Sequence, residues 1–250
     1  MGGKPDYGNW VSKKFIYIPG VMSLVSFGLA LLVPVLVILA GLFFLVSIYF
    51  AYARYRFSPQ GGNVEDEVRE LVLAHLDWNG EGRALDIGCG NAALTIKLAH
   101  KYARARVIGI DYWGRKWEYS KSICEGNAKM EGVTERVTFR KASASALPFE
   151  DEYFDAVVSN LVFHEVSDVA DKRAVIREAL RVVKKGGKFA FQDLFLLKRV
   201  YGDRDELMGT IRGWGIRKVE FVETRDSAFI PMALKLPFMV GTIGLIIGRK

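Results

Sequence analysis

The chain has 250 residues, enough for one α/β domain of ordinary size with a short additional segment. Its hydrophobic fraction of 50% is high, and its formal net charge of +7 suits nucleic acid, an anionic membrane or an acidic ligand as a partner. The two cysteines form no C-x-x-C pair and no metal-ligand spacing with the three histidines, so neither a disulfide framework nor a metal site is predicted.

An apolar run without any charged residue covers positions 15–52 and predicts attachment to a membrane. As one helix it would be about 57 Å long, whereas the hydrocarbon core of a bilayer is about 30 Å thick. Because Pro34 lies near the middle, we expect a transmembrane helical hairpin with helices near 15–32 and 35–53. A single long, tilted or kinked helix is the main alternative, since the run is much longer than the apolar region of a secretory signal.

Positive charges on both sides of the run predict its orientation. Lys13 and Lys14 precede it, and Arg54 and Arg56 follow it, which places both ends in the cytoplasm under the positive-inside rule. The expected organisation is a cytoplasmic segment at 1–14, a membrane segment at 15–56, a linker at 57–63 and a catalytic domain on the cytoplasmic side at 64–250.

Helices and strands alternate through the rest of the chain. Helices are predicted at 64–76, 93–102, 115–130 and 170–183, and strands at 84–87, 106–110, 137–141, 154–159, 188–193, 219–224 and 242–249. This βα alternation predicts an α/β fold with a doubly wound, mainly parallel sheet.

A glycine loop follows the first strand and predicts a nucleotide site. Gly88-Cys89-Gly90 lies between that strand and a helix, where a backbone without side chains can approach a ligand and the free N–H groups of the helix start point toward it. Asp111 ends the second strand, about 20 residues after the loop, where an acidic side chain binds ribose hydroxyls in dinucleotide folds.

Four segments then resemble one family in order and spacing: LDIGCGNA, GIDYW, ASALPFEDEYFDAVVSNLVFHEV and ALRVVKKGGKFAFQD. They resemble the class I S-adenosylmethionine-dependent methyltransferases, in particular the type 11 group that includes ubiquinone and menaquinone biosynthesis enzymes. The resemblance covers about residues 65–195. It implies a Rossmann-like, seven-stranded sheet with an antiparallel last strand, and S-adenosyl-L-methionine as the cofactor.

The resemblance also implies which residues bind that cofactor. They are Asp86, Gly88, Cys89, Gly90, Asp111, Tyr112, Ser143, Ala144 and Asn160. Asp111 would bind the ribose hydroxyls and Tyr112 would pack on the adenine. Ser143 occupies the adenine-edge position where the family often has Asp, so a hydroxyl or a backbone N–H would make that contact here.

The acceptor site is less clearly marked. His164 and Glu165 follow the fourth strand and Asp193 ends the fifth, at the sheet edge where ligands bind. His164 is the candidate catalytic residue, taking a proton or holding the acceptor. The alternative is a structural histidine that bonds a backbone carbonyl.

Two further segments are candidates for contact with the acceptor. If the apolar run is a hairpin, Tyr7 and Trp10 return to the catalytic side and could cap the pocket; the alternative is a disordered tail. The loop 227–241 is apolar and lies at the substrate end in this fold, so it would contact a membrane or hydrophobic ligand, or pack on its own sheet.

The sequence thus predicts a membrane-attached methyltransferase acting on a lipid-like or other hydrophobic acceptor, with membrane lipids as partners. One alternative is a methyltransferase for a soluble small molecule, with the membrane segment only as an anchor. The other is a membrane protein that binds the cofactor without catalysis. Nucleic acid is not expected, because the positive charges are dispersed and no N-P-P-[FY]-like motif follows the fourth strand.

Overall fold

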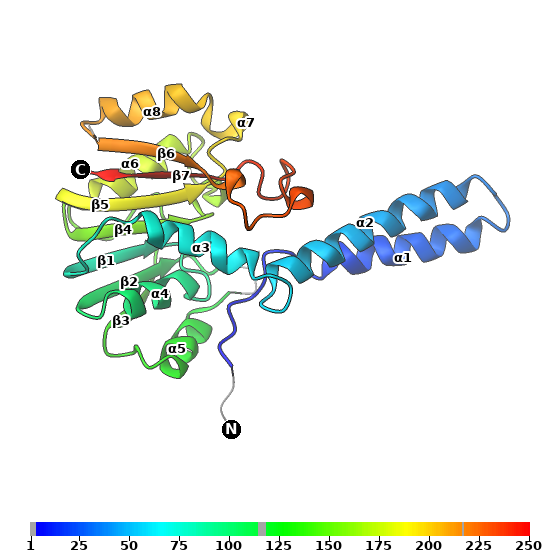
Figure 1. The fold of residues 1–250 in the computed structure, drawn as a ribbon, viewed down its shortest axis with the longest axis horizontal. Helices are drawn as coiled ribbons and strands as arrows, with labels where there is room; N and C mark the ends of the chain where they lie inside the picture. Colours follow the sequence, from blue (N-terminus) through cyan, green and yellow to red (C-terminus); the bar gives the residue numbers. More distant parts are fainter. Residues whose placement is uncertain (1–3, 115–118, 217) are drawn as a thin grey trace. The chain divides into compact units, whose positions relative to one another are not determined.

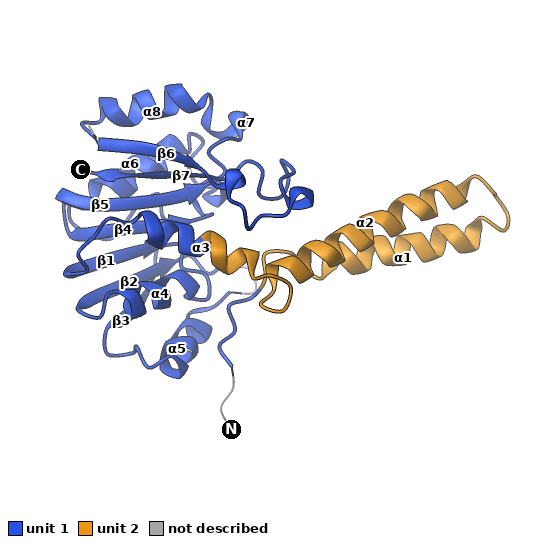
Figure 2. Ribbon diagram, in the orientation of Figure 1, with its two compact units in different colours: residues 1–8, 69–250 blue, residues 9–68 orange. Residues whose placement is uncertain are grey.

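The computed structural model describes residues 4–114, 119–216 and 218–250. The chain divides into two compact units (Figure 2). The sheet unit comprises residues 1–8 and 69–250, and the helical unit comprises residues 9–68.

Two antiparallel helices make up most of the helical unit. α1 (Lys14–Leu29) and α2 (Leu36–Phe57) are joined by a turn that contains Pro34. Proline lacks an N–H and is tolerated just before a helix, which is where Pro34 lies; Pro19, by contrast, lies inside α1. The break predicted at Pro34 is therefore present, although α1 ends before position 32 and α2 continues beyond position 53.

Serine side chains join the two helices. The Ser23 hydroxyl donates to the carbonyl of Ala40 over 2.8 Å, and the Ser47 hydroxyl donates to the carbonyl of Ile16 over 2.9 Å. Among the described helices, α2 alone has both the length and the apolar composition to cross a membrane. The prediction of two membrane-spanning helices is therefore not confirmed by length and composition, since α1 has only 16 residues.

The sheet unit contains one seven-stranded sheet in the order β3-β2-β1-β4-β5-β7-β6 (Figure 1). Its strands are β1 (Gly82–Ile87), β2 (Ala105–Asp111), β3 (Val137–Lys141), β4 (Phe154–Asn160), β5 (Val183–Asp193), β6 (Lys218–Glu223) and β7 (Gly244–Arg249). The first five are parallel, and β7 runs antiparallel to both of its neighbours. The predicted seven-stranded Rossmann-like sheet with an antiparallel last strand is thus confirmed.

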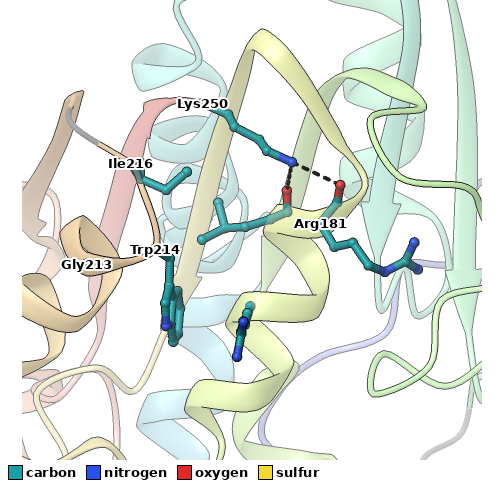
Figure 3. A pocket seen from close by; sticks show the side chains of 7 residues that line it. Arg181, Gly213, Trp214, Ile216 and Lys250 are labelled. Atoms are coloured by element: carbon teal, nitrogen blue, oxygen red, sulfur yellow. Dashed lines mark hydrogen bonds between the residues drawn. The ribbon is translucent and has the colours of Figure 1, made fainter.

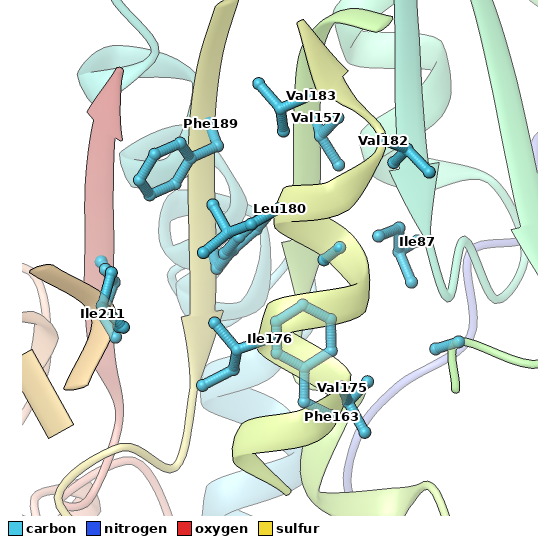
Figure 4. Close-up of a cluster of buried hydrophobic side chains, with 14 of the residues drawn as sticks. Ile87, Val157, Phe163, Val175, Ile176, Leu180, Val182, Val183, Phe189 and Ile211 are labelled. Carbon is cyan, nitrogen blue, oxygen red and sulfur yellow. The ribbon is translucent and has the colours of Figure 1, made fainter. Parts of the chain in front are cut away.

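Helices cover both faces of this sheet because strand side chains alternate between two apolar clusters. Leu85 and Ile87 of β1 join one cluster, and Ala84 joins the other. The first cluster packs against α6 (Arg173–Arg181) and α8 (Arg204–Gly213) (Figure 4). The second packs against α3 (Val64–His75), α4 (Ala93–Lys101) and α5 (Lys121–Met130).

Some element boundaries differ from the predictions. The helix expected over 115–130 begins at Lys121, because the Ser120 hydroxyl accepts a hydrogen bond from the Ile123 N–H and caps it; positions 115–118 lie outside the described residues. β5 starts at Val183 rather than at 188. The short helix α7 (Lys198–Tyr201) and α8 were not predicted.

Candidate functional site

Three of the predicted site residues and the start of the predicted glycine loop lie at one edge of the sheet. β1 ends at Ile87, β2 at Asp111, β4 at Asn160 and β5 at Asp193. These strands are parallel and in register, so their carboxyl ends and the loops that follow them meet at the same edge. In open α/β sheets this edge, next to the point where the strand order reverses, is where ligands bind.

The glycine loop after β1 has no room for a side chain at position 88. Gly88 has a φ of +74°, and a Cβ atom there would lie 2.0 Å from Cγ2 of Val162. Gly90 has a φ of +56°, and its N–H donates to Oδ2 of Asp111 over 2.9 Å. Glycine is therefore required at position 88 both for the backbone conformation and for the approach of the loop after β4.

The Asp111 carboxylate organises the loop from the end of β2. Its Oδ1 accepts from the Trp113 N–H over 2.7 Å, and its Oδ2 accepts from the Gly90 N–H. Burial raises the pKa of Asp111, although these hydrogen bonds act in the opposite direction. Each carboxylate oxygen keeps a lone pair for ligand hydroxyls. Trp113, which the sequence analysis missed, also donates from Nε1 to the Gly90 carbonyl over 3.0 Å.

Asp86 in β1 and Cys89 within the loop both have buried side chains. Asp86 is 1% exposed and accepts a 2.6 Å hydrogen bond from the Thr95 hydroxyl of α4. Burial raises the pKa of Asp86 to about 7. Burial also raises the pKa of the Cys89 thiol, which keeps it protonated. Asp86 therefore joins the end of β1 to α4, the Cys89 side chain packs in the second apolar cluster, and direct contact of either with a ligand stays a prediction.

The adenine-side residues are only partly available. Tyr112 is 65% exposed, with the Lys141 ammonium 5.2 Å from its ring centroid. The Ser143 hydroxyl donates to Oδ2 of Asp168 over 3.1 Å. Asp168 thus accepts from the hydroxyl, which is one of the two groups predicted for the adenine contact, and that contact stays a prediction. Ala144 is buried.

Asn160 supplies a test of whether the predicted cofactor fits this edge. Its Oδ1 atom is buried and has no hydrogen-bond partner among the described residues. A buried amide oxygen costs free energy unless a donor reaches it. The amino group and hydroxyls of S-adenosylmethionine are such donors, so the residues present fit this cofactor.

His164 forms a charged cluster at the same edge. Its Nδ1–H donates to Oδ1 of Asp193 over 2.7 Å, and its Nε2 lies 3.5 Å from Oε1 of Glu165. Asp193 is fully buried, and its Oδ2 also accepts from the Phe163 N–H over 2.7 Å. Burial lowers the pKa of His164, but hydrogen bonds with Asp193 and Glu165 outweigh it and raise the pKa to about 9. His164 is therefore an imidazolium at neutral pH.

A short amino-terminal segment lies against the glycine loop, and we call Asp6–Gly8 the strap. The amide of Asn127 accepts from the Asp6 N–H over 3.0 Å and donates to the Asp6 carbonyl over 2.8 Å. It also donates to the carbonyl of Asn91, in the loop, over 2.9 Å. Asn127 is 1% exposed. One buried side chain thus joins the strap, α5 and the loop, a role the sequence analysis did not foresee.

Tyr7 and Trp10, the predicted cap residues, belong to different units. The Tyr7 hydroxyl donates to Oε1 of Glu131 over 3.2 Å, and its ring packs against the core under α5. Trp10 lies in the helical unit, with its ring centroid 5.7 Å from that of Phe57. The structure thus places Tyr7 beside the glycine loop and its helices, and contact of either residue with an acceptor stays a prediction.

A hollow of about 430 Å³ lies at the opposite end of the strands, near the start of β5 and the end of β7 (Figure 3). Its lining includes Trp214, Arg181 and Lys250. The Lys250 ammonium caps α6 by donating to the carbonyls of Leu180 and Arg181 over 3.0 and 3.1 Å. Arg181 also pairs with Glu178. These side chains serve the fold, so this hollow is not the candidate site.

Comparison with known proteins identifies the class of this domain. Residues 85–191 match the family described as "Methyltransferase domain". An uncharacterized methyltransferase of Bacillus subtilis, YcgJ, is 34% identical over 129 residues, 52% of this chain and 47% of that protein. A demethylmenaquinone methyltransferase of Roseiflexus castenholzii is 35% identical over 109 residues, 44% of this chain and 41% of that protein. The chain thus spans about half the length of the curated relatives it matches.

Solved structures support the fold. A geranyl diphosphate C-methyltransferase of Streptomyces coelicolor, crystallised with S-adenosyl-L-homocysteine, aligns with a TM-score of 0.57 over 74% of this chain and 79% of its own. At 15% identity, this likeness shows the fold alone. The family match and the class I fold together make residues 85–191 an enzyme domain of the methyltransferase type, with S-adenosylmethionine as its cofactor.

Proposed function

We propose that this chain, with its S-adenosylmethionine-dependent methyltransferase domain, is a membrane-attached enzyme that methylates a lipid-like or other hydrophobic acceptor. The observation that carries the proposal is the apolar outer surface of the helical unit. Leu31, Leu32 and Leu24 are 87%, 82% and 74% exposed, and only 11% of the apolar window of α2 is buried. An apolar surface this continuous needs an apolar environment.

The way the chain connects the two units supports insertion from one side of the membrane. Residues 1–8 and 69–250 belong to the same unit, so the helical unit begins and ends at the sheet unit. At 1.5 Å per residue α2 is about 33 Å long and α1 about 24 Å, against a hydrocarbon core of about 30 Å. We therefore propose that the pair enters and leaves on the cytoplasmic side, where Lys13, Lys14, Arg54 and Arg56 would lie.

The chemistry of the His164 cluster favours an acceptor with an acidic hydroxyl. An imidazolium lowers the pKa of a hydroxyl beside it and so stabilises the oxyanion. Asp193, buried and bonded to Nδ1, fixes the orientation of the ring, and Nε2 lies 3.5 Å from Oε1 of Glu165. Three of the relatives are named demethylmenaquinone methyltransferases, and this name is in keeping with the proposed kind of acceptor.

The residues of the domain divide the task of methyl transfer. When bound, S-adenosylmethionine supplies a methyl group already activated for displacement, so positioning can provide much of the rate. The glycine loop and Asp111 bind and orient the cofactor. The Oδ1 atom of Asn160 accepts a hydrogen bond from the cofactor. His164 holds the acceptor oxygen at the same sheet edge.

The test is methyl transfer in membranes. Native membranes are incubated with the full-length protein and methyl-labelled S-adenosylmethionine, with Asp111→Ala as the control for cofactor binding. Label in the lipid extract that depends on Asp111 supports the proposal. Label confined to the aqueous fraction would instead favour a soluble acceptor, and cofactor binding without any transfer would favour a non-catalytic protein.

A further inference from the structure

The loop between β6 and β7 has a fixed shape. The Val240 N–H donates to the carbonyl of Leu234 over 3.1 Å, and the Gly241 N–H donates to that of Leu236 over 3.0 Å. The Thr242 hydroxyl adds a bond of 3.2 Å to the carbonyl of Pro237. These contacts within a span of nine residues make the loop a folded element rather than a loose connection.

Its apolar side chains form an anchored set and a projecting set. Ile230, Leu234 and Val240 are 3%, 0% and 1% exposed, so they form the buried side of the loop. Met232, Leu236 and Phe238 are 80%, 38% and 66% exposed, and we call these three the wedge. The loop was predicted either to pack on its own sheet or to contact a membrane or hydrophobic ligand. Burial makes the first role possible only for the anchored set.

The loop lies at the edge of the sheet that carries the candidate site. Gly244, the first residue of β7, pairs with Asp193, the last residue of β5. Asp193 is the residue that orients His164. The wedge thus belongs to the end of the domain where the acceptor must arrive.

We propose that the wedge enters the interfacial layer of the lipid bilayer and so brings the acceptor edge of the domain to the membrane surface. This inference rests on the membrane attachment proposed above. Three projecting side chains are few for a protein interface, which uses about 20–30 residues on each side. They suit the headgroup and acyl boundary, where short apolar elements insert. Lys235, inside the wedge sequence, suits anionic headgroups there.

The test measures the depth of single positions in the full-length protein. Met232→Cys and Phe238→Cys are spin-labelled in nanodiscs that contain anionic lipid. Cys89 and Cys124 are buried, so the label goes to the introduced thiol, and labelling of the unsubstituted protein checks this. Met130→Cys, on α5 and 46% exposed, is the matched control in the sheet unit.

The expected result is a severalfold higher ratio of oxygen to nickel-chelate collisions at 232 and 238 than at 130. A label at Leu42→Cys, on α2 and 56% exposed, reports separately on the helical unit. Position 42 in lipid, with positions 232 and 238 in water like position 130, would refute insertion of the wedge. The proposal that the helical unit attaches the protein to the membrane would be unaffected. If position 42 also contacts water, both proposals fail.

Discussion

Asn127→Ala should release the strap from the glycine loop and weaken cofactor binding. In the structure, the Asn127 side chain is the buried link between Asp6 and the carbonyl of Asn91. A methyl group at position 127 can neither donate nor accept. The strap then has no bond to this amide, and the Asn91 carbonyl loses a donor on the side of the loop that faces α5.

The magnitude follows from the three hydrogen bonds that are lost. Each buried partner left unsatisfied costs about 1–3 kcal/mol, but the detached strap can hydrate Asp6, so the carbonyl of Asn91 carries most of the penalty. We expect a loss of about 1–3 kcal/mol in the free energy of unfolding. If about half of this is coupled to the loop, the Kd for the cofactor rises roughly two- to tenfold, since about 1.4 kcal/mol corresponds to a factor of ten.

The assay combines calorimetry with hydrogen exchange. S-adenosylmethionine is titrated into the full-length protein in detergent, and exchange of the Asp6 amide is followed in the same preparation. Met130→Ala, on the same helix and partly exposed, is the control and should leave both unchanged. If Asn127→Ala binds the cofactor with the same Kd as wild type while its Asp6 amide exchanges fast, the strap and the glycine loop are not coupled.

Three other substitutions test the site. Gly88→Ala should lower cofactor affinity more than tenfold in a calorimetric titration, because its Cβ would lie 2.0 Å from a methyl group of Val162. Asp111→Asn should weaken binding by about an order of magnitude, since an amide NH₂ would face one of two backbone N–H groups. In wild type, turnover should fall as pH rises through about 9, where His164 loses its proton, and His164→Gln should remove this pH dependence. A turnover that rises over the same pH range would indicate that His164 acts as a general base instead. The stability contributed by protonated His164 is fully present below about pH 6.5 and is lost through about pH 9, which thermal unfolding from pH 6 to 10 can measure.

Local patterns were enough to predict the central part of the fold. The strand, glycine loop and helix around Gly88 are encoded by adjacent residues, and so is the acidic end of β2 at Asp111. The strand order could be expected because βα alternation leaves few arrangements of a parallel sheet. His164 follows β4 and Asp193 ends β5. Because the carboxyl ends of parallel strands lie at one edge of the sheet, these two residues could be expected to meet there.

The parts that were missed depend on distant contacts. Asn127 looks like an ordinary polar residue of an amphipathic helix, yet its partners lie 121 and 36 positions away. α7 has only four residues, too few to show a helical period. β5 reaches back to Val183 because it pairs there with Phe154, a contact that overrides the turn signal of the glycines at 186 and 187.

The serine bonds between α1 and α2 constrain how the helical unit can evolve. Ser23 and Ile16 lie seven residues apart on one helix, and Ser47 and Ala40 are separated by the same interval on the other. Seven residues are about two helical turns, so both bonds occupy a single seam. A residue inserted between the two contacts would rotate one of them by about 100° out of the seam while leaving the hydropathy of the segment unchanged. The seven-residue interval between the two contacts on each helix, and not only apolar character, should therefore be under selection.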